Sequence, residues 1–146
     1  MEFTRVNFRP SFFGDRPLVL LEDGELKATA FCYESGVCGL KIENEHCSMV
    51  VLPYMGQQIW FAEFEGRNLT QKSIFDQPLA TTKFGDNYGG LLLHCGLTNI
   101  NCPGDGEDYP IHGELPFANY PETYAGIGRD ESGVYLAVGG TFVYRN

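Results

Sequence analysis

Apolar and polar residues alternate in short runs along the first half of the chain, and the runs end at glycine, proline or acidic residues. Between Leu26 and Tyr33 every second residue is apolar: Leu26, Ala28, Ala30 and Cys32. A period of two places successive side chains on opposite faces of a β-strand. The same pattern predicts five strands at the spacing of β-hairpins: Leu18–Leu21, Leu26–Tyr33, Val37–Glu43, Cys47–Leu52 and Gln58–Glu65.

The second half adds two predicted strands, Tyr120–Gly128 and Val134–Arg145. Two glycines in the middle of the last run, Gly139 and Gly140, indicate a β-bulge or a close backbone approach. None of these windows repeats apolar residues at every third and fourth position, which is the pattern of an amphipathic helix. We therefore predict an all-β protein of antiparallel strands.

Two segments follow neither period. Residues 1–17 contain Pro10, Gly14 and Pro17, so we predict an irregular lead-in whose phenylalanines are covered by the rest of the protein. Thr70–Asn87 is predicted to be a long connection on the surface. A connection of that length inside a compact domain is unusual and is often functional.

Composition agrees with this fold class and narrows the function. The 146 residues correspond to about one domain, so we predict a single domain over residues 1–146. Aromatic residues make up 14% of the chain and glycine occurs 18 times, which is a mixture of strand and turn formers. The formal net charge of −9 disfavours nucleic acid and an anionic membrane surface as partners.

The predicted localisation rests on features that the sequence lacks: a membrane span, a signal peptide and an even number of cysteines. No window is long and apolar enough to span a membrane, and the first residues carry charges and Pro10 where a signal peptide has its apolar centre. The five cysteines are an odd number, which favours free thiols over a disulfide framework. We predict a soluble, cytoplasmic protein in which most cysteines are small core residues.

Candidate chemistry is concentrated in Gly89–Phe117, which holds two of the three histidines, two of the five cysteines and several carboxylates. Its glycines and prolines fit no regular helix or strand, although Leu91–Leu93 predicts the start of a buried strand. Imidazoles, carboxamides and carboxylates bind sugar hydroxyls, and aromatic rings pack against sugar C–H faces. We predict a sugar site with the polar candidates His94, Asn99, Glu107 and His112 and an aromatic face from Trp60, Tyr88 or Tyr109.

Each polar candidate also has a structural explanation. The His112 imidazole is compatible with a hydrogen bond to the backbone in a partly buried position, and His94, next to three leucines, with packing in the core. Glu107 is compatible with an exposed acidic loop. A zinc site is disfavoured because adjacent His94 and Cys95 cannot easily bind one ion, so we predict no metal.

Several short runs resemble the aldose 1-epimerases (galactose mutarotases) and their mutarotase-like relatives. Two lie in the predicted strands: Val50-Val51-Leu52-Pro53 and Phe64-Glu65-Gly66-Arg67-Asn68-Leu69. The more specific ones lie in the central stretch: Gly89-Gly90-Leu91-Leu92, Cys95-Gly96-Leu97-Thr98-Asn99 and Asp108-Tyr109-Pro110-Ile111-His112-Gly113. The resemblance starts near Val37 and corresponds to the N-terminal portion of that family.

The resemblance implies a fold and an activity. The fold is a large antiparallel β-sandwich, the galactose mutarotase-like supersandwich, which this chain would form only in part. The activity is the interconversion of sugar anomers without a cofactor: a carboxylate takes the proton of the anomeric hydroxyl and a histidine protonates the ring oxygen. Carried over by position, His112 matches the family's first catalytic histidine and Asn99 a hydrogen bond to the substrate.

The match is incomplete toward the C-terminus. No histidine follows His112, and no later carboxylate matches the catalytic Glu, so the chain would supply one wall of the site. The last apolar strand would leave an uncovered edge, which we expect a missing C-terminal half or a second copy of the chain to cover. Two alternatives stay open: a non-catalytic carbohydrate-binding or interaction module, and a structural β domain that forms a homodimer.

Overall fold

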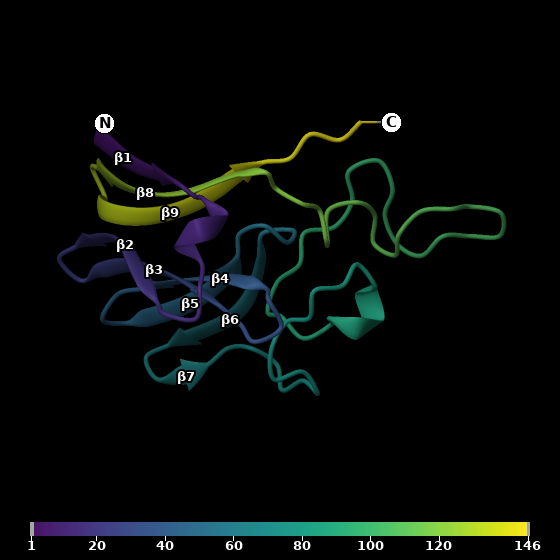
Figure 1. Ribbon diagram of the computed structural model, residues 1–146, viewed down its shortest axis with the longest axis horizontal. Helices are drawn as coiled ribbons and strands as arrows, with labels where there is room; N and C mark the ends of the chain where they lie inside the picture. Colours follow the sequence, from purple (N-terminus) through teal and green to yellow (C-terminus); the bar gives the residue numbers. More distant parts are fainter. Residues whose placement is uncertain (1, 146) are drawn as a thin grey trace.

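The computed structural model describes residues 2–145 and shows nine β-strands in this range (Figure 1). They are β1 (Glu2–Asn7), β2 (Leu18–Asp23), β3 (Leu26–Cys32), β4 (Cys38–Glu43), β5 (Cys47–Leu52), β6 (Gln58–Phe64), β7 (Arg67–Asn68), β8 (Glu122–Asp130) and β9 (Gly133–Thr141). Two short 3-10 turns, η1 (Pro10–Phe12) and η2 (Phe84–Asp86), complete the regular structure. The described residues contain no α-helix, so the prediction of an all-β protein is confirmed.

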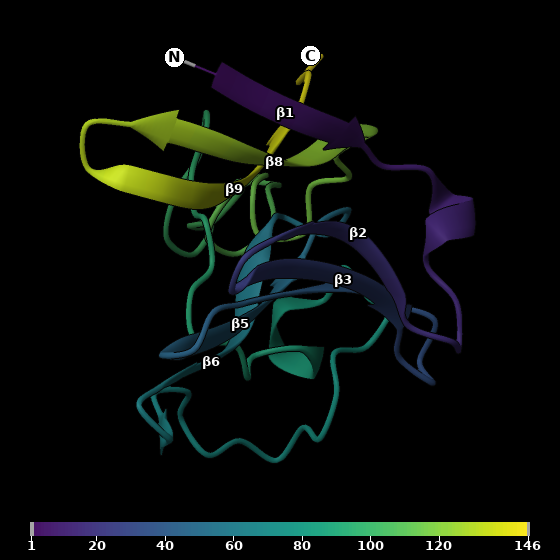
Figure 2. The ribbon, with the colours of Figure 1, turned by 90° about the vertical axis from the view of Figure 1, so that its left-hand side faces the viewer.

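The strands form two antiparallel sheets that lie one above the other, which is consistent with a β-sandwich (Figures 1 and 2). The larger sheet has the order β2-β3-β4-β5-β6-β7, so each strand pairs with the next one in the chain. The smaller sheet has the order β1-β8-β9. Because β8 contacts β2 and β9 contacts β3, the smaller sheet covers the β2–β3 side of the larger one.

Tight turns explain the six-stranded meander. Gly24 joins β2 to β3 with a φ of 60°, and Gly66 joins β6 to β7 with a φ of 71°. Residues with side chains rarely adopt this left-handed backbone, which glycine reaches at no steric cost. The five strands predicted between residues 18 and 65 are confirmed, and their ends differ from the prediction by no more than two residues.

The prediction of an irregular lead-in over residues 1–17 is wrong for its first residues. Instead of an irregular lead-in, residues 2–7 form β1, which pairs with β8 near the other end of the chain. The ring of Phe3 lies over Gly126, where an added Cβ would be 2.3 Å from the ring. This pairing depends on a strand far away in the sequence, so the local pattern around Pro10 did not indicate it.

The end of the last strand also differs from the prediction. β9 stops at Thr141 and does not continue to Arg145. Its register against β8 runs without a shift, so the bulge predicted at Gly139 and Gly140 is wrong, whereas the close backbone approach is confirmed at Gly140. A Cβ on Gly140 would lie 2.9 Å from the backbone carbonyl oxygen of Glu122. The register shifts occur elsewhere, in the β2–β3 and β5–β6 pairs.

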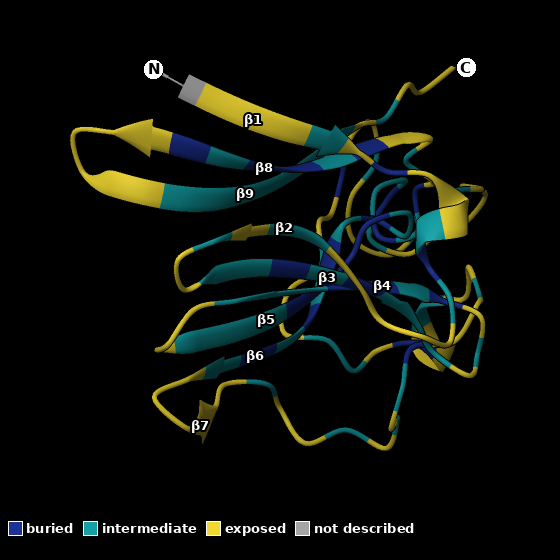
Figure 3. Cartoon of the chain, turned by 60° about the vertical axis from the view of Figure 1, so that its left-hand side comes forward, coloured by how far each residue is buried: buried dark blue, intermediate teal, exposed yellow. Residues whose placement is uncertain are grey.

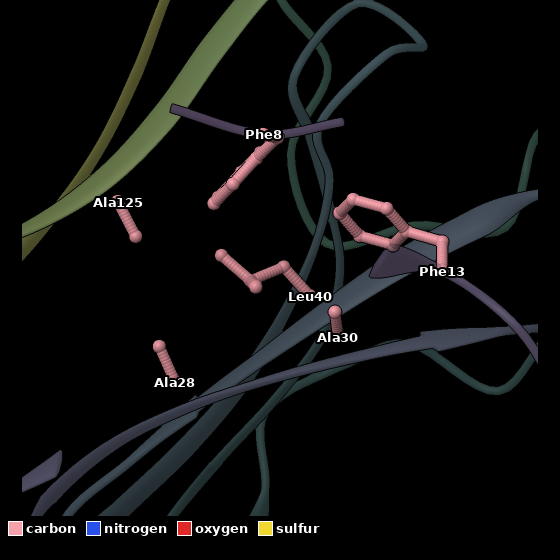
Figure 4. Packing of buried hydrophobic residues seen from close by; sticks show 6 residues of the cluster. All are labelled: Phe8, Phe13, Ala28, Ala30, Leu40 and Ala125. Atoms are coloured by element: carbon pink, nitrogen blue, oxygen red, sulfur yellow. The ribbon is translucent and has the colours of Figure 1, made fainter. Parts of the chain in front are cut away.

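The main core lies between the two sheets and consists of Phe8, Phe13, Ala28, Ala30, Leu40 and Ala125 (Figure 4). The three alanines leave space for the rings of Phe8 and Phe13, whose centroids are 5.5 Å apart in an edge-to-face arrangement. The N-terminal phenylalanines are therefore covered as predicted, except that Phe3 is 41% exposed.

A second cluster, Val37, Val50, Leu52 and Trp60, lies on the other face of the large sheet. The connection over residues 70–87 packs on it through Phe75 and is exposed or half-buried over most of its length (Figure 3). The connection is fastened to the β3–β4 turn, because Ser35 N donates to Gln77 Oε1 (3.0 Å) and Ser35 Oγ donates to the carbonyl of Pro78 (2.5 Å). The predicted surface connection is thus confirmed, with η2 as its one regular turn.

Residues 88–121 gather as loops at one end of the two sheets (Figure 1). The buried strand predicted at Leu91–Leu93 is wrong, because only Leu92 forms a bridge, to Ile59, and it is 43% exposed. The backbone hydrogen bonds of Leu91 and Leu92 to β6 all go to Ile59. No helix among the described residues has the length and apolar character needed to cross a membrane.

Candidate functional site

A cavity of about 710 Å³ opens among the loops at this end of the molecule. One group of lining residues comes from the segment 69–75 (all but Thr70), a second from Phe84, Gly85 and residues 88–91, and the rest are Leu93, Cys95 and His112. A volume of this size is within the usual range for small-molecule sites. This loop-end cavity is therefore the candidate functional site.

His112 stands in the cavity wall in a left-handed backbone conformation, with a φ of 65°. Its amide N–H donates to the carbonyl of Asn101 (2.6 Å), and its carbonyl accepts from the amide of Gly96 (2.8 Å). The imidazole packs against the ring of Phe84, with centroids 4.5 Å apart. Left-handed residues with side chains are uncommon and concentrate at functional sites, where surrounding bonds hold them in place.

Gly113 lets the two arms of the loop meet. An added Cβ would be 2.1 Å from the carbonyl oxygen of Asn99 and 2.9 Å from that of Gly96, and the φ of Gly113 is 85°. A parallel bridge joins Gly96 to Gly113 at the same point. Only a residue without a side chain fits there, so Gly113 fixes the position of its neighbour His112.

Glu114 locks the same junction through its carboxylate. Oε2 accepts from the amides of Thr98 (3.1 Å) and Asn99 (3.4 Å), while Oε1 accepts from Thr98 Oγ1 (2.5 Å) and Asn99 Nδ2 (2.7 Å). These bonds stabilise the ionised form, those from Thr98 most, and they lower the pKa of Glu114 to about 2. Glu114 therefore holds the loop and is poorly suited to take a proton at neutral pH.

Two aromatic rings line the cavity beside His112. Phe84 begins η2, and its ring centroid is 5.1 Å from that of Tyr88, which is 63% exposed. Tyr88, one of the three aromatic candidates, is thus an accessible lining residue. Phe84, which contacts both Tyr88 and His112, was missed because it lies in a connection without a hydrophobic period.

Trp60 lies beneath the cavity and does not line it. Its side chain is 6% exposed and belongs to the second core cluster. Gly89 and Gly90 pass directly over it, since a Cβ on Gly89 would be 3.1 Å from Trp60 Cη2 and one on Gly90 would be 3.4 Å from Cε3. Trp60 therefore supports Gly89 and Gly90, which form the floor of the cavity, and offers no ring face to a ligand.

The remaining candidates lie outside the cavity. His94 is exposed between the lining residues Leu93 and Cys95, so it is not a core histidine. Glu107 accepts a hydrogen bond from the amide of Gly104 (2.7 Å) within the exposed acidic loop. Asn99 bonds to Glu114, one step removed from His112. The structure thus places His112 in the wall, Asn99 at the junction with Glu114, and His94 and Glu107 elsewhere on the loop.

The charge of the lining differs from that of the chain. Lys72 and His112 contribute basic groups, and none of the described lining residues is Asp or Glu, although the chain carries a net charge of −9. Lys72 lies in the segment predicted to be a surface connection, and nothing in its local sequence marks it. Within residues 2–145, no group of three or more His, Cys, Asp or Glu side chains is arranged to hold a metal ion.

Comparison of the chain with models of protein families, with curated proteins and with solved structures finds no match. The cavity, the residues that hold it, and the short runs that resemble aldose 1-epimerases are therefore the features that bear on function.

Proposed function

We propose that this chain binds a carbohydrate in the loop-end cavity, as a mutarotase-like protein in which His112 contacts the sugar. The observation that carries the proposal is the position of His112, whose imidazole borders a cavity while its backbone is held in a left-handed conformation by both loop arms. His112 also lies in the more specific part of the resemblance to aldose 1-epimerases. The finer assignment, a galactose mutarotase-like β-sandwich, rests on the same runs.

The lining supplies the two kinds of contact that a sugar needs. Tyr88 presents an aromatic face for the C–H groups of the ring. Gln71, Ser73 and the His112 imidazole present hydrogen-bonding groups for its hydroxyls. A monosaccharide fits within 710 Å³ with space for bound water.

The charge of the lining favours an anionic sugar. Lys72 forms no ion pair with another described residue, and no described lining residue is Asp or Glu, so a phosphate or carboxylate on the ligand would give Lys72 a counter-charge. This local ion pair would have to outweigh the repulsion that the net charge of −9 exerts on an anion. We therefore place a sugar phosphate or a uronic acid ahead of a neutral aldose as the ligand.

Anomer interconversion needs a base as well as an acid. His112 is the proposed acid toward the ring oxygen, but no carboxylate lines the cavity among the described residues. Glu114, the nearest in sequence, is engaged by Thr98 and Asn99, and its lowered pKa makes it a weak base. The isomerase activity that we propose therefore requires a carboxylate from another segment or a second polypeptide.

The test is an NMR titration of the His112 imidazole with galactose, glucose 6-phosphate and inorganic phosphate. We expect saturable shifts with the sugars, tightest for the phosphorylated one. In His112→Ala, where backbone amide signals around the cavity replace the missing imidazole as the readout, the affinity should be roughly tenfold lower. His94→Ala is the matched control, because His94 lies on the same loop outside the lining. Lys72→Met should weaken only the phosphorylated sugar, with Lys83→Met, outside this cavity, as its control.

The outcomes separate the two parts of the proposal. If no sugar shifts the His112 signals, the carbohydrate site is wrong. If galactose and glucose 6-phosphate bind equally well, the site stands and the preference for an anion is wrong. If inorganic phosphate alone binds as tightly as the phosphorylated sugar, the cavity recognises an anion and the carbohydrate proposal fails.

A non-catalytic carbohydrate-binding module is the second candidate, favoured by the lack of a carboxylate in the described lining. Anomer exchange, followed by NMR on the purified chain, distinguishes the two. Acceleration that is lost in His112→Ala supports the isomerase. Sugar binding without acceleration supports the binding module.

A second copy of the chain remains a proposed partner. β9 is an edge strand of the smaller sheet, so one side of its backbone has no strand partner in the described chain. Such an edge can pair with a strand of another chain. Light scattering over a range of concentrations tests this, and a monomeric mass at every concentration would exclude the homodimer.

A further inference from the structure

Two cysteines face each other across the β3–β4 hairpin. Cys32 is the last residue of β3, Cys38 is the first of β4, and the two are register partners. The neighbouring pair is hydrogen-bonded, since the amide of Tyr33 donates to the carbonyl of Val37, while the amide of Cys32 points away and donates to Gly14. Cys32 and Cys38 therefore occupy a non-hydrogen-bonded position, where facing side chains come closest.

The geometry of this position is compatible with a covalent link. Facing Cα atoms at non-hydrogen-bonded positions are about 4.5 Å apart, which lies within the range of roughly 4.4–6.8 Å seen in disulfides. The pKa of Cys38 is raised to about 11, mainly by burial and further by the charge of Cys32 and a hydrogen bond with it. The two thiols therefore interact. Both residues are free thiols and half-buried, so a small oxidant can approach them.

We infer that Cys32 and Cys38 form an oxidisable dithiol site, which a peroxide converts into a disulfide across the β3–β4 hairpin. This site is independent of the loop-end cavity and of its ligand. Cys95 and Cys102, the two exposed cysteines, lie in the loops and are not register partners in a sheet.

The chemistry balances with hydrogen peroxide as the oxidant. The Cys32 thiolate attacks one peroxide oxygen, the O–O bond breaks, and Cys32 becomes a sulfenic acid while hydroxide takes up a proton to give water. The Cys38 sulfur then attacks the Cys32 sulfur, so that the S–S bond forms and the S–O bond breaks. The leaving hydroxide takes the proton of Cys38 as a second water. Two thiols lose two electrons, and one peroxide becomes two waters.

Cys32 is assigned the first attack because Cys38 holds its proton at neutral pH, given its raised pKa. The link would close the short turn that carries Ser35, which fastens the connection over residues 70–87 to this hairpin. Hydrogen exchange in this turn should therefore slow on oxidation, because the base of the hairpin can no longer open.

The test uses the folded full chain, treated with hydrogen peroxide and then alkylated without reduction. Trypsin releases residues 28–41 as one peptide containing both cysteines, whereas Cys47, Cys95 and Cys102 fall in other peptides. We expect this peptide to lose two hydrogens and to resist alkylation. Cleavage after Glu34 should give two fragments that separate only on reduction.

Cys38→Ser should abolish the cross-link and leave Cys32 as a sulfenic acid or a more oxidised form. Cys47→Ser is the matched control in the next strand and should leave the cross-link unchanged. The wild-type peptide decides the matter even if a variant fails to fold. Full alkylation of both cysteines in residues 28–41, under conditions that oxidise Cys95 or Cys102, would overturn the proposal.

Discussion

In the six-stranded sheet, hydrogen bonds join strands that follow one another in the chain, whereas at the loop end the backbone of Thr98 and Asn99 bonds to the side chain of Glu114. The sheet is thus held by groups that every residue carries. The loop end depends on particular side chains and on glycines in left-handed conformations, such as Gly113. A substitution in the sheet is therefore felt mainly through packing, and one in the loop mainly through geometry.

The largest effect is expected from Leu40→Ala in the main core. Leu40 is 0% exposed in β4 and packs between the sheets, so truncation leaves a cavity and should lower the free energy of unfolding by about 3 kcal/mol. Urea denaturation measures this value. Because the loop end rests on the sheets, the His112 NMR signals should shift to unfolded positions together with those of the sheet. Loop signals that persist after the sheet has unfolded would show that the two regions are independent.

The next effect is expected from Gly113→Ala, which isolates the geometry of the loop. The added Cβ would clash with the carbonyl of Asn99 and would also meet an unfavourable φ, so we expect a loss of about 2 kcal/mol and displaced His112 signals.

The matched control is Gly106→Ala. Gly106 has a nearly identical φ of 83°, but its Cβ would meet nothing within 4 Å, so only backbone strain of about 1 kcal/mol remains. Equal losses in the two variants would mean that close packing at Gly113 does not hold the loop.

This contrast explains how far the sequence predicts the structure. Alternation in Leu26–Tyr33 and the glycine turns specify β2 to β6, because register and burial there follow from neighbours in the chain. β1 was not predicted because its partner, β8, is remote in the sequence. At the candidate site, residue types pointed to His112. They did not point to Phe84 or to Glu114, because the contact of Phe84 with His112 and the bond of Glu114 to Asn99 form only in the folded protein.

The third effect is a loss of stability at low pH, which originates at the loop end. Hydrogen bonds hold the pKa of Glu114 at about 2, below its ordinary value of 4.5. A carboxyl group with a lowered pKa stabilises the folded state above its unfolded pKa, and this contribution is lost as the pH falls from 4.5 toward 2.

We expect the His112 environment to change in this pH window before the sheet unfolds, as seen by NMR. Glu114→Gln removes the charge and should flatten this part of the pH profile. Glu107→Gln, from the acidic loop, is the control that should leave it intact. A wild-type profile unchanged between pH 4.5 and 2 would contradict the locking role of Glu114.

The smallest effect comes from the turns of the six-stranded sheet. Here the folded state loses stability as the pH rises, whereas at Glu114 it loses stability as the pH falls. His46, in the β4–β5 turn, contacts Glu65 through Nδ1 (2.6 Å) and Glu45 through Nε2 (2.8 Å), and these carboxylates raise its pKa above 6.5, the Glu65 hydrogen bond most strongly. A raised pKa stabilises the folded state fully below the unfolded value, and the contribution is lost as the pH rises through the folded pKa. The site is exposed, so the stability change should be slight and reduced by salt.

An NMR titration of His46 measures this effect directly. Glu65→Gln should lower the pKa of His46 more than Glu45→Gln, because the hydrogen bond to Glu65 is the larger cause of the shift. If the two variants lower it equally, both carboxylates act only as nearby charges. The turns of the sheet would then lack the specific side-chain bonding that distinguishes the loop end.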